Sequence, residues 1–287
     1  MNRWLVGARL RTLPAAVVPV AMGASLAVGE SGASWWRVVP AGIVSLALQV
    51  GVNYANDYSD GVRGTDDDRI GPTRLVASGL ATPSEVKQAA FSAFGVAALA
   101  GLLLAAATSW WLILVGIVAV LAAWGYTGGP KPYGYLGLGE IFVFVFFGLV
   151  ATLGTVYVVI ERLPFVSWLI GSSAGSLACA LLVTNNLRDI EGDAKVGKRT
   201  LAVRLGDERT RRLYAGFMLV ALGLLIVAAP WRPGALLGLL AFPWLRKPVR
   251  GVLRGVRGRG LIAVLGDTGR FQLIVGALVT IGIALVG

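Results

Sequence analysis

The 287-residue chain contains no histidine and a single cysteine. The lack of histidine excludes histidine-ligated zinc, Ser-His-Asp catalysis and histidine proton relays. The one cysteine, Cys179, cannot form a disulfide within the chain, and its position in an apolar run indicates a packing role. Charged residues are also scarce, at 14% of the chain, so the places where they gather are informative.

Long apolar runs dominate the rest of the sequence. Apolar residues make up 56% of the chain and its mean hydropathy is +0.74, too high for a soluble domain of this size. The runs predict an all-α polytopic membrane protein. Pro14 and Pro19 lie in the first run, and no clear small-residue cleavage site ends it, so we interpret it as a retained span rather than a signal peptide. Nine spans are predicted, over residues 13–28, 38–55, 89–107, 110–126, 138–160, 167–183, 214–229, 234–245 and 271–286.

The basic residues follow the predicted membrane topology. The chain carries 26 Lys and Arg against 15 Asp and Glu, for a net charge of +11. If the N-terminus is cytoplasmic, nine spans place every Lys and Arg on the cytoplasmic side except Arg37, Arg162 and Arg232. The positive-inside rule therefore predicts a multi-pass protein of the cell (inner) membrane with a cytoplasmic N-terminus. Because topology and anionic lipid account for the charge, the lipid bilayer is a predicted partner and nucleic acid is not.

Two acidic clusters follow apolar runs about half a chain apart. The first is "NYANDYSDGVRGTDDD" from residue 53, and the second is "TNNLRDIEGDAKVGKRTLAVRLG" from residue 184. In the second cluster, Asn185, Asp189 and Asp193 are four residues apart, so on a helix they form one stripe. Asn56 and Asp60 of the first cluster share that spacing.

Both clusters fall at the ends of even-numbered predicted spans, and hence at the same, cytoplasmic membrane face. We interpret the chain as a single membrane domain, residues 1–287, with a weak internal repeat. The two repeats cover residues 1–135 and 136–260, and residues 261–287 form a final helix.

Asn and Asp side chains offer oxygen ligands, which suit a hard cation and Mg²⁺ above all. Mg²⁺ is commonly held by a few carboxylates together with phosphate oxygens of a substrate, so a phosphorylated partner is expected. Arginine and lysine near the acids suit that partner, since they bind phosphate oxygens. For Asp66, Asp67 and Asp68 taken separately, a solvated turn explains the carboxylates equally well.

A third stretch, "YTGGPKPYGYLGLGE" from residue 126, joins the fourth and fifth predicted spans on the same face. Its Gly and Pro content predicts a tight loop, in which Lys131 is the one cation. Glu140 lies at the start of a span, where an unpaired charge is expensive. The tyrosines of the loop, among them Tyr126, either line an aromatic pocket or form an interfacial belt. Elsewhere, Glu85 after Thr82 predicts a capping box at a helix start.

These motifs resemble those of a known family. "NDYSDGVRGTD" and "NNLRDIEGDAKVGKRTLAVRLG" are similar to the two Asp-rich motifs of the UbiA-type intramembrane prenyltransferases. The loop "YTGGPKPYGYLGLGE" and the segment "GPTRLVASG" resemble the family's 1,4-dihydroxy-2-naphthoate polyprenyltransferase branch, which serves menaquinone (vitamin K2) biosynthesis. Gly61 directly after Asp60, and "TRLVASG" further on, depart from the 4-hydroxybenzoate branch. The last third of the chain matches mainly in hydropathy.

The resemblance implies a fold, a reaction and a set of site residues. The fold is nine transmembrane helices around a central cavity, with Mg²⁺ at its cytoplasmic mouth and a lateral opening to lipid. The reaction is Mg²⁺-dependent transfer of a polyprenyl group from a polyprenyl diphosphate to 1,4-dihydroxy-2-naphthoate, with loss of CO₂ and diphosphate, toward demethylmenaquinone. The implied metal residues are Asn56, Asp60, Asp189 and Asp193, supported by Asp57 and Asp66. From the residues themselves, we predict Asp60, Asp189 and, because it lies between the clusters, Lys131 as catalytic. The basic residues predicted to bind diphosphate are Arg63, Arg74, Lys195, Lys198 and Arg199, and the predicted acceptor residues are Asn53 and Tyr126.

Two alternatives stay open and a third is excluded. Another aromatic acceptor, similar to 4-hydroxybenzoate, is compatible with the same motifs. A transporter would place acidic residues near span centres and on both membrane sides, whereas here they gather at one face. A CDP-alcohol phosphatidyltransferase shares the opening "DYSDG", but Gly64-Thr65 stands where its signature needs Ala-Arg, and the second cluster is too distant.

Overall fold

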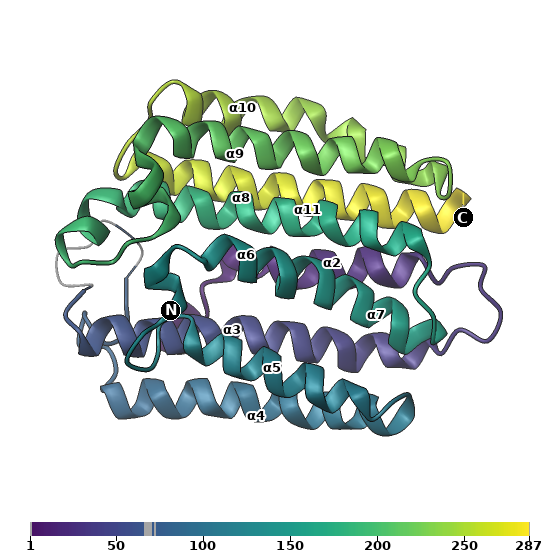
Figure 1. Cartoon of the computed structure of the whole chain (residues 1–287), viewed down its shortest axis with the longest axis horizontal. Helices are drawn as coiled ribbons and strands as arrows, with labels where there is room; N and C mark the ends of the chain where they lie inside the picture. Colours follow the sequence, from purple (N-terminus) through teal and green to yellow (C-terminus); the bar gives the residue numbers. More distant parts are fainter. Residues whose placement is uncertain (1, 66–70, 72, 287) are drawn as a thin grey trace.

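The structure of the protein, a computed structural model, describes residues 2–65, 71 and 73–286. Within these residues the regular structure is entirely helical, which confirms the predicted all-α class. The helices run roughly parallel and antiparallel along one long axis (Figure 1). The main helices are α1 (Arg3–Ala8), α2 (Pro14–Ser25), α3 (Val38–Val62), α4 (Pro83–Ala107), α5 (Trp111–Gly125), α6 (Gly139–Val143), α7 (Ala151–Ile160), α8 (Phe165–Lys195), α9 (Leu201–Ala228), α10 (Phe242–Leu253) and α11 (Gly260–Val286).

Shorter helical turns connect or extend these helices. A π-helical segment continues α6 into α7, so that Gly139–Ile160 forms one apolar helical run. A 3₁₀ segment leads directly into α10. The short segments are η1 (Leu10–Thr12), η2 (Trp35–Arg37), η3 (Tyr133–Leu136), η4 (Phe144–Val150, the π-helical one) and η5 (Pro233–Ala241).

All nine predicted spans are helical, but they differ in their ability to cross a membrane. In the described part of the chain, six helical runs are long and apolar enough to cross: Trp35–Val62, Pro83–Ala107, Gly139–Ile160, Phe165–Lys195, Leu201–Ala228 and Gly260–Val286. The bent pair Arg3–Thr12 and Pro14–Ser25, with 54° between its halves, would make a seventh. Helix α5 has 15 residues, about 22 Å at 1.5 Å per residue, which is short against a hydrocarbon core of about 30 Å. The protein is therefore a multi-pass membrane protein, and length and composition by themselves support six or seven of the nine spans.

The start of α4 has the predicted capping box. The Thr82 side chain accepts a hydrogen bond from the Glu85 backbone N–H, and the Glu85 carboxylate accepts one from the Thr82 backbone N–H. Arg3 also pairs with Glu85 at 2.9 Å, which ties α1 to the start of α4. Glu85 therefore has a structural role in the helix start.

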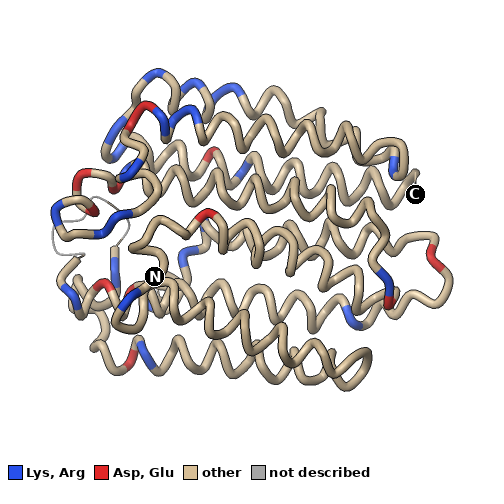
Figure 2. Tube along the Cα trace, viewed as in Figure 1, with Lys and Arg blue, Asp and Glu red and all other residues tan. Residues whose placement is uncertain are grey.

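Charged residues gather at one end of the bundle, with a smaller group at the other end and few between them (Figure 2). At the sparsely charged end, three ion pairs join neighbouring loops: Arg232–Glu30, Arg162–Glu30 and Arg37–Glu161. Their arginines are the three that the predicted topology places outside the cytoplasmic side. The separation of charge along the long axis agrees with a bundle whose ends face two aqueous compartments.

Small residues let some of these helices approach closely. A Cβ atom added at Gly282 of α11 would lie 2.1 Å from the Gly234 carbonyl oxygen at the start of η5. Close approach of backbones at glycine is a common way to pack helices in a bilayer, where hydrophobic burial cannot drive association. This contact holds η5 closely against α11.

We expect Gly282→Ala to lower the free energy of unfolding by about 1–3 kcal/mol, because backbone must move to admit the methyl group. Gly223→Ala on α9 is the matched control, since a Cβ atom added there would meet nothing within 4 Å. Thermal unfolding in detergent measures both. Equal midpoints for the two variants would contradict the proposed close packing.

Candidate functional site

A long cavity opens among α3, α5, the α6–α7 run and α8. Its volume is about 730 Å³. On α3 its lining extends from Ala41 to Asp60, about 28 Å at 1.5 Å per residue. One end is lined by acidic and basic residues of both motifs, and the other by aliphatic side chains such as Val44, Leu112 and Val158. The cavity thus combines a charged mouth with an apolar depth.

Helix α3 carries the first motif. The helix continues past the predicted end of its span, residue 55, as far as Val62. Gln49, Asn53, Asn56 and Asp60 all line the cavity, because their spacings of four, three and four place them on one helical face. Asn56 Oδ1 accepts a hydrogen bond from the Thr127 hydroxyl at 2.7 Å.

Asp60 has partners from three other parts of the chain. Its side chain is almost fully buried, and the Tyr135 hydroxyl donates to its Oδ1 at 2.8 Å. Arg74 and Lys198 approach Oδ2, at 4.0 Å and 3.6 Å. Burial raises the pKa of the Tyr135 phenol, and the adjacent Asp60 charge raises it further, so Tyr135 stays a hydrogen-bond donor at neutral pH.

Helix α8 carries the second motif, and the predicted stripe is confirmed. The helix runs to Lys195, and Asn185, Asp189 and Asp193 all line the cavity. Arg188 holds Asp189 with two hydrogen bonds of 2.7 Å each, from Nε and from one terminal nitrogen. This bidentate pair limits the positions that the Asp189 carboxylate can adopt.

The two motifs meet through Lys198, which follows α8. Its ammonium group lies 3.6 Å from Asp60 Oδ2 and 3.8 Å from Asp193 Oδ1. One cation therefore bridges carboxylates from α3 and α8, which are more than 130 residues apart in the sequence. The predicted convergence of both motifs on one mouth is confirmed.

The donor set at this mouth suits a divalent cation whose coordination is completed by a substrate. Among the described residues, no three Asp, Glu or Cys side chains converge closely enough to form a metal site by themselves. The Lys198 ammonium between two carboxylates nevertheless shows that this space favours positive charge. Oxygen ligands from Asp and Asn, extended by phosphate oxygens, fit the usual coordination of Mg²⁺.

Asp57 requires a correction. Both of its carboxylate oxygens accept backbone N–H groups, of Leu75 at 2.9 Å and Val76 at 3.1 Å. The physical reason is helical geometry, because residue 57 lies about 100° around the helix from Asn56. Asp57 thus anchors the turn that carries Arg74, and it is not among the cavity-lining residues. Asp66, the other supporting metal residue, lies outside the described residues.

The predicted basic residues divide into three groups. Arg74 and Lys198 line the cavity. Arg63 instead donates to the carbonyl oxygens of Thr127 and Gly129, and so holds the loop after α5. The remaining three, Lys131, Lys195 and Arg199, are exposed and do not line the cavity. Of the six predicted basic residues, Arg74 and Lys198 are therefore the two that the structure places at the cavity.

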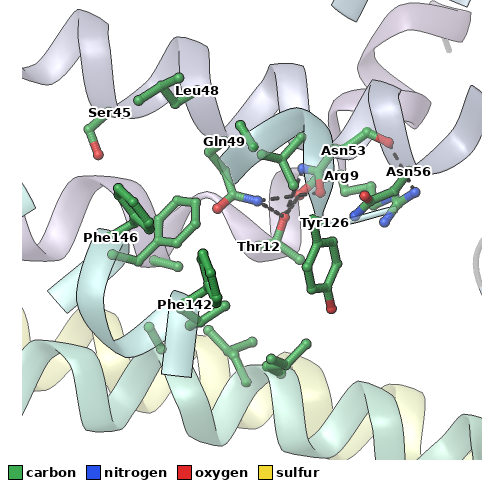
Figure 3. A pocket seen from close by; sticks show the side chains of 18 of the residues that line it. Arg9, Thr12, Ser45, Leu48, Gln49, Asn53, Asn56, Tyr126, Phe142 and Phe146 are labelled. Atoms are coloured by element: carbon green, nitrogen blue, oxygen red, sulfur yellow. Dashed lines mark hydrogen bonds between the residues drawn. The ribbon is translucent and has the colours of Figure 1, made fainter. Parts of the chain in front are cut away.

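A polar network lines part of the cavity (Figure 3). The sequence predicted Asn53 as a site residue but not its partners in this network. Asn53 Nδ2 donates to the Thr12 hydroxyl at 3.1 Å, and Gln49 Nε2 donates to Asn53 Oδ1 at 3.3 Å. Arg9 donates to the Asn53 carbonyl oxygen at 3.2 Å, from a left-handed backbone position with φ of 52°. The spacing of Gln49, Asn53 and Asn56 in the sequence could have predicted the network, because it extends the stripe of the first Asp-rich motif into the preceding apolar run.

Aromatic side chains face this network across the cavity: Tyr126, Phe142 and Phe146 (Figure 3). Phe142 stacks on Tyr133 with ring centroids 3.8 Å apart. Tyr126 and Tyr133 also meet edge to face, with their centroids 5.5 Å apart. Of the two alternatives for the loop tyrosines, the pocket is confirmed for Tyr126.

The chain is similar over most of its length to curated proteins. A 1,4-dihydroxy-2-naphthoate octaprenyltransferase of Mycobacterium tuberculosis is 52% identical over 275 residues, covering 95% of this chain and 93% of the relative. A protein with the same name from Escherichia coli is 36% identical over 299 residues, covering 98% and 95%.

Solved structures and the family's sequence model agree with these relatives. A UbiA homolog from Archaeoglobus fulgidus, solved with GPP and Mg²⁺ bound, has a TM-score of 0.68 and 15% identity, with 97% of this chain and 99% of that chain covered. At this identity the likeness concerns the fold. The sequence model described as the UbiA prenyltransferase family matches residues 16–255. With most of its length matched in this way, the chain belongs to the UbiA prenyltransferase family.

Proposed function

We propose that this protein transfers a polyprenyl group from an allylic polyprenyl diphosphate to 1,4-dihydroxy-2-naphthoate, with loss of CO₂ and diphosphate. The observation that carries the proposal is the joining of two Asp-rich helix ends, through Lys198, at the mouth of one long apolar cavity. The names of relatives that are 52% and 36% identical over nearly the whole chain support the naphthoate as acceptor.

At the mouth, Asn56, Asp60, Asp189 and Asp193 would hold Mg²⁺. The ion, when bound, neutralises the charge that develops on the departing diphosphate. Arg74 and Lys198 bind the diphosphate directly, since both line the cavity beside Asp60. Cations placed in advance at a leaving group stabilise the transition state more than the ground state.

The apolar depth of the cavity accommodates the prenyl chain. Its lining there is aliphatic and includes Val44, Leu48, Leu112 and Val158. Such walls exclude water, which would otherwise capture the allylic carbocation. The bilayer receives whatever length of isoprenoid the cavity does not enclose.

The aromatic acceptor fits between the polar network and the aromatic wall. Asn53, with Arg9 beside it, offers hydrogen bonds and positive charge, and Tyr126 offers a ring face (Figure 3). In the net reaction the allylic C–O bond breaks and its electron pair leaves with diphosphate. A ring carbon forms the new C–C bond, and the bond to the carboxylate breaks, returning its electron pair to the ring as CO₂ departs.

The single-domain organisation and the orientation belong to the same proposal. A cytoplasmic N-terminus would place the charged mouth, and hence both soluble diphosphate and naphthoate, on the cytoplasmic side of the cell membrane. The concentration of charge at one end of the bundle supports this orientation (Figure 2).

Diphosphate release by the purified protein tests the function. We expect release from a polyprenyl diphosphate when the naphthoate and Mg²⁺ are present, no release after chelation, and recovery when Mg²⁺ is restored. With 4-hydroxybenzoate added in competition, we expect the prenylated naphthoate as the main product. Preference for 4-hydroxybenzoate would favour the related acceptor class, and no release with any aromatic acceptor would favour a transporter.

A further inference from the structure

A buried carboxylate stands directly behind the cavity wall. Glu140, at the start of α6, is 5% exposed and is not among the residues that line the cavity. Its Oε1 accepts a hydrogen bond from Asn186 Nδ2 at 3.0 Å, which links α6 to α8. Burying a carboxyl group at the end of a membrane helix costs free energy. Packing alone therefore does not explain why a glutamate lies at this position.

The pair determines how Asn186 faces the cavity. Asn186 lines the cavity between Asn185 and Asp189. The amide of Asn186 uses its nitrogen in this bond, with Glu140 Oε1 as the acceptor. The acceptor Oδ1 is then the polar atom left for the cavity, and no donor of the described residues reaches it. This part of the wall therefore offers a hydrogen-bond acceptor to a ligand.

The surroundings make the same wall unfavourable for anions. The Tyr126 hydroxyl lies beside Gly139, where a Cβ atom would come within 3.4 Å of it, next to Glu140. An amide oxygen facing the cavity also disfavours an anionic oxygen at this wall, because two hydrogen-bond acceptors cannot pair with each other. Of the cavity-lining cations, Arg9, Arg11, Arg74 and Lys198 lie on other elements, and Arg188 on α8 is already paired with Asp189. An aromatic acid would thus direct its carboxylate toward the cations and a neutral hydroxyl toward Asn186.

We propose that Glu140 is a positioning residue for the aromatic acceptor, an inference that rests on the proposed function. By accepting the Asn186 amide N–H, Glu140 holds Asn186 Oδ1 toward the cavity, where it accepts a hydrogen bond from a ring hydroxyl. The proton stays on that hydroxyl, and Glu140 takes part in no bond change. A hydrogen bond of this kind raises electron density in the ring and favours attack on the allylic carbocation.

Separate Michaelis constants for the two substrates test this role. We expect Glu140→Ala to raise KM for the naphthoate about tenfold, and to leave KM for the polyprenyl diphosphate unchanged. Glu140→Gln keeps an acceptor oxygen for Asn186 and should restore most of the affinity. Cys179→Ala is the matched control, because its thiol donates to the Glu140 carbonyl oxygen at 3.2 Å and not to the carboxylate.

Competitive inhibition by 2-naphthoate, which lacks both hydroxyls, separates positioning from general damage. Its inhibition constant should be the same in wild type and Glu140→Ala, because it cannot form the bond that the variant loses. Asn186→Leu should show the same selective loss, which keeps the test valid if Glu140→Ala folds poorly. Equal losses for both substrates, or weaker binding of 2-naphthoate, would overturn the inference. Failure of wild type to prenylate the naphthoate would instead overturn the proposed function.

Discussion

Replacing Asp60 by alanine is expected to lower turnover by about 10²–10³-fold, and the protein should stay folded in detergent. The Asp60 carboxylate lies between Tyr135, Arg74 and Lys198 at the cavity mouth. Its loss would remove an oxygen ligand that would hold the metal, and with it part of the neutralisation of the departing diphosphate. Losses of that kind in preorganised sites typically cost about 10²–10³-fold per group. Asp189→Ala should have the same effect. Turnover in saturating Mg²⁺ and a thermal midpoint for each variant are the measurements.

Glu191→Ala is the control for the alanine variants. Glu191 lies on α8 between the two acids of the second motif, but it is exposed and does not line the cavity. We expect it to have the activity of wild type. Near-normal turnover in Asp60→Ala or Asp189→Ala would refute the assignment of these residues to the metal and the diphosphate.

Lys198→Met is expected to lower kcat/KM for the polyprenyl diphosphate by about 10²-fold. Lys198 bridges Asp60 and Asp193, so its removal takes a cation from the point where the leaving group gathers charge. Methionine keeps most of the length of the side chain without its charge. Initial rates over a range of diphosphate concentrations would measure the change.

The matched variant for this experiment is Lys131→Met. Lys131 is exposed on the loop before η3 and lies outside the cavity lining. We expect its kcat/KM to stay within about twofold of wild type, as is usual for an exposed charge outside a binding site. If both variants lost activity equally, the sequence-based assignment of Lys131 to catalysis would be the better one.

The local pattern of the sequence was sufficient to predict part of the site. Helical periodicity placed Asn185, Asp189 and Asp193 on one face of α8, because residues four apart overlap along a helix regardless of what packs against it. The same rule explains why Asn56 and Asp60 share a face of α3. Charge asymmetry and hydropathy placed both motifs at one end of the bundle, since the bilayer acts on each span separately.

Closeness to a motif in the sequence did not show which individual residues line the cavity. Asp57 sits between two site residues, yet its carboxylate is used by the backbone of the turn that holds Arg74. Lys131, Lys195 and Arg199 are near the motifs in the sequence, but long exposed side chains are oriented by loop geometry that periodicity does not describe. Arg9, Gln49 and Asn186 became visible as cavity residues once the helices were packed.

The amino-acid sequence by itself determined that this is a helical membrane protein of the UbiA family with two oxygen-rich helix ends. Hydropathy, spacing and charge are local properties that each segment carries before it meets another. Only the tertiary structure decided that Lys198 joins those ends, that Asp57 holds the backbone beside Arg74, and that Glu140 stands behind Asn186. Those relations depend on which faces of α3, α6 and α8 pack together, and that is fixed by contacts between residues far apart in the chain.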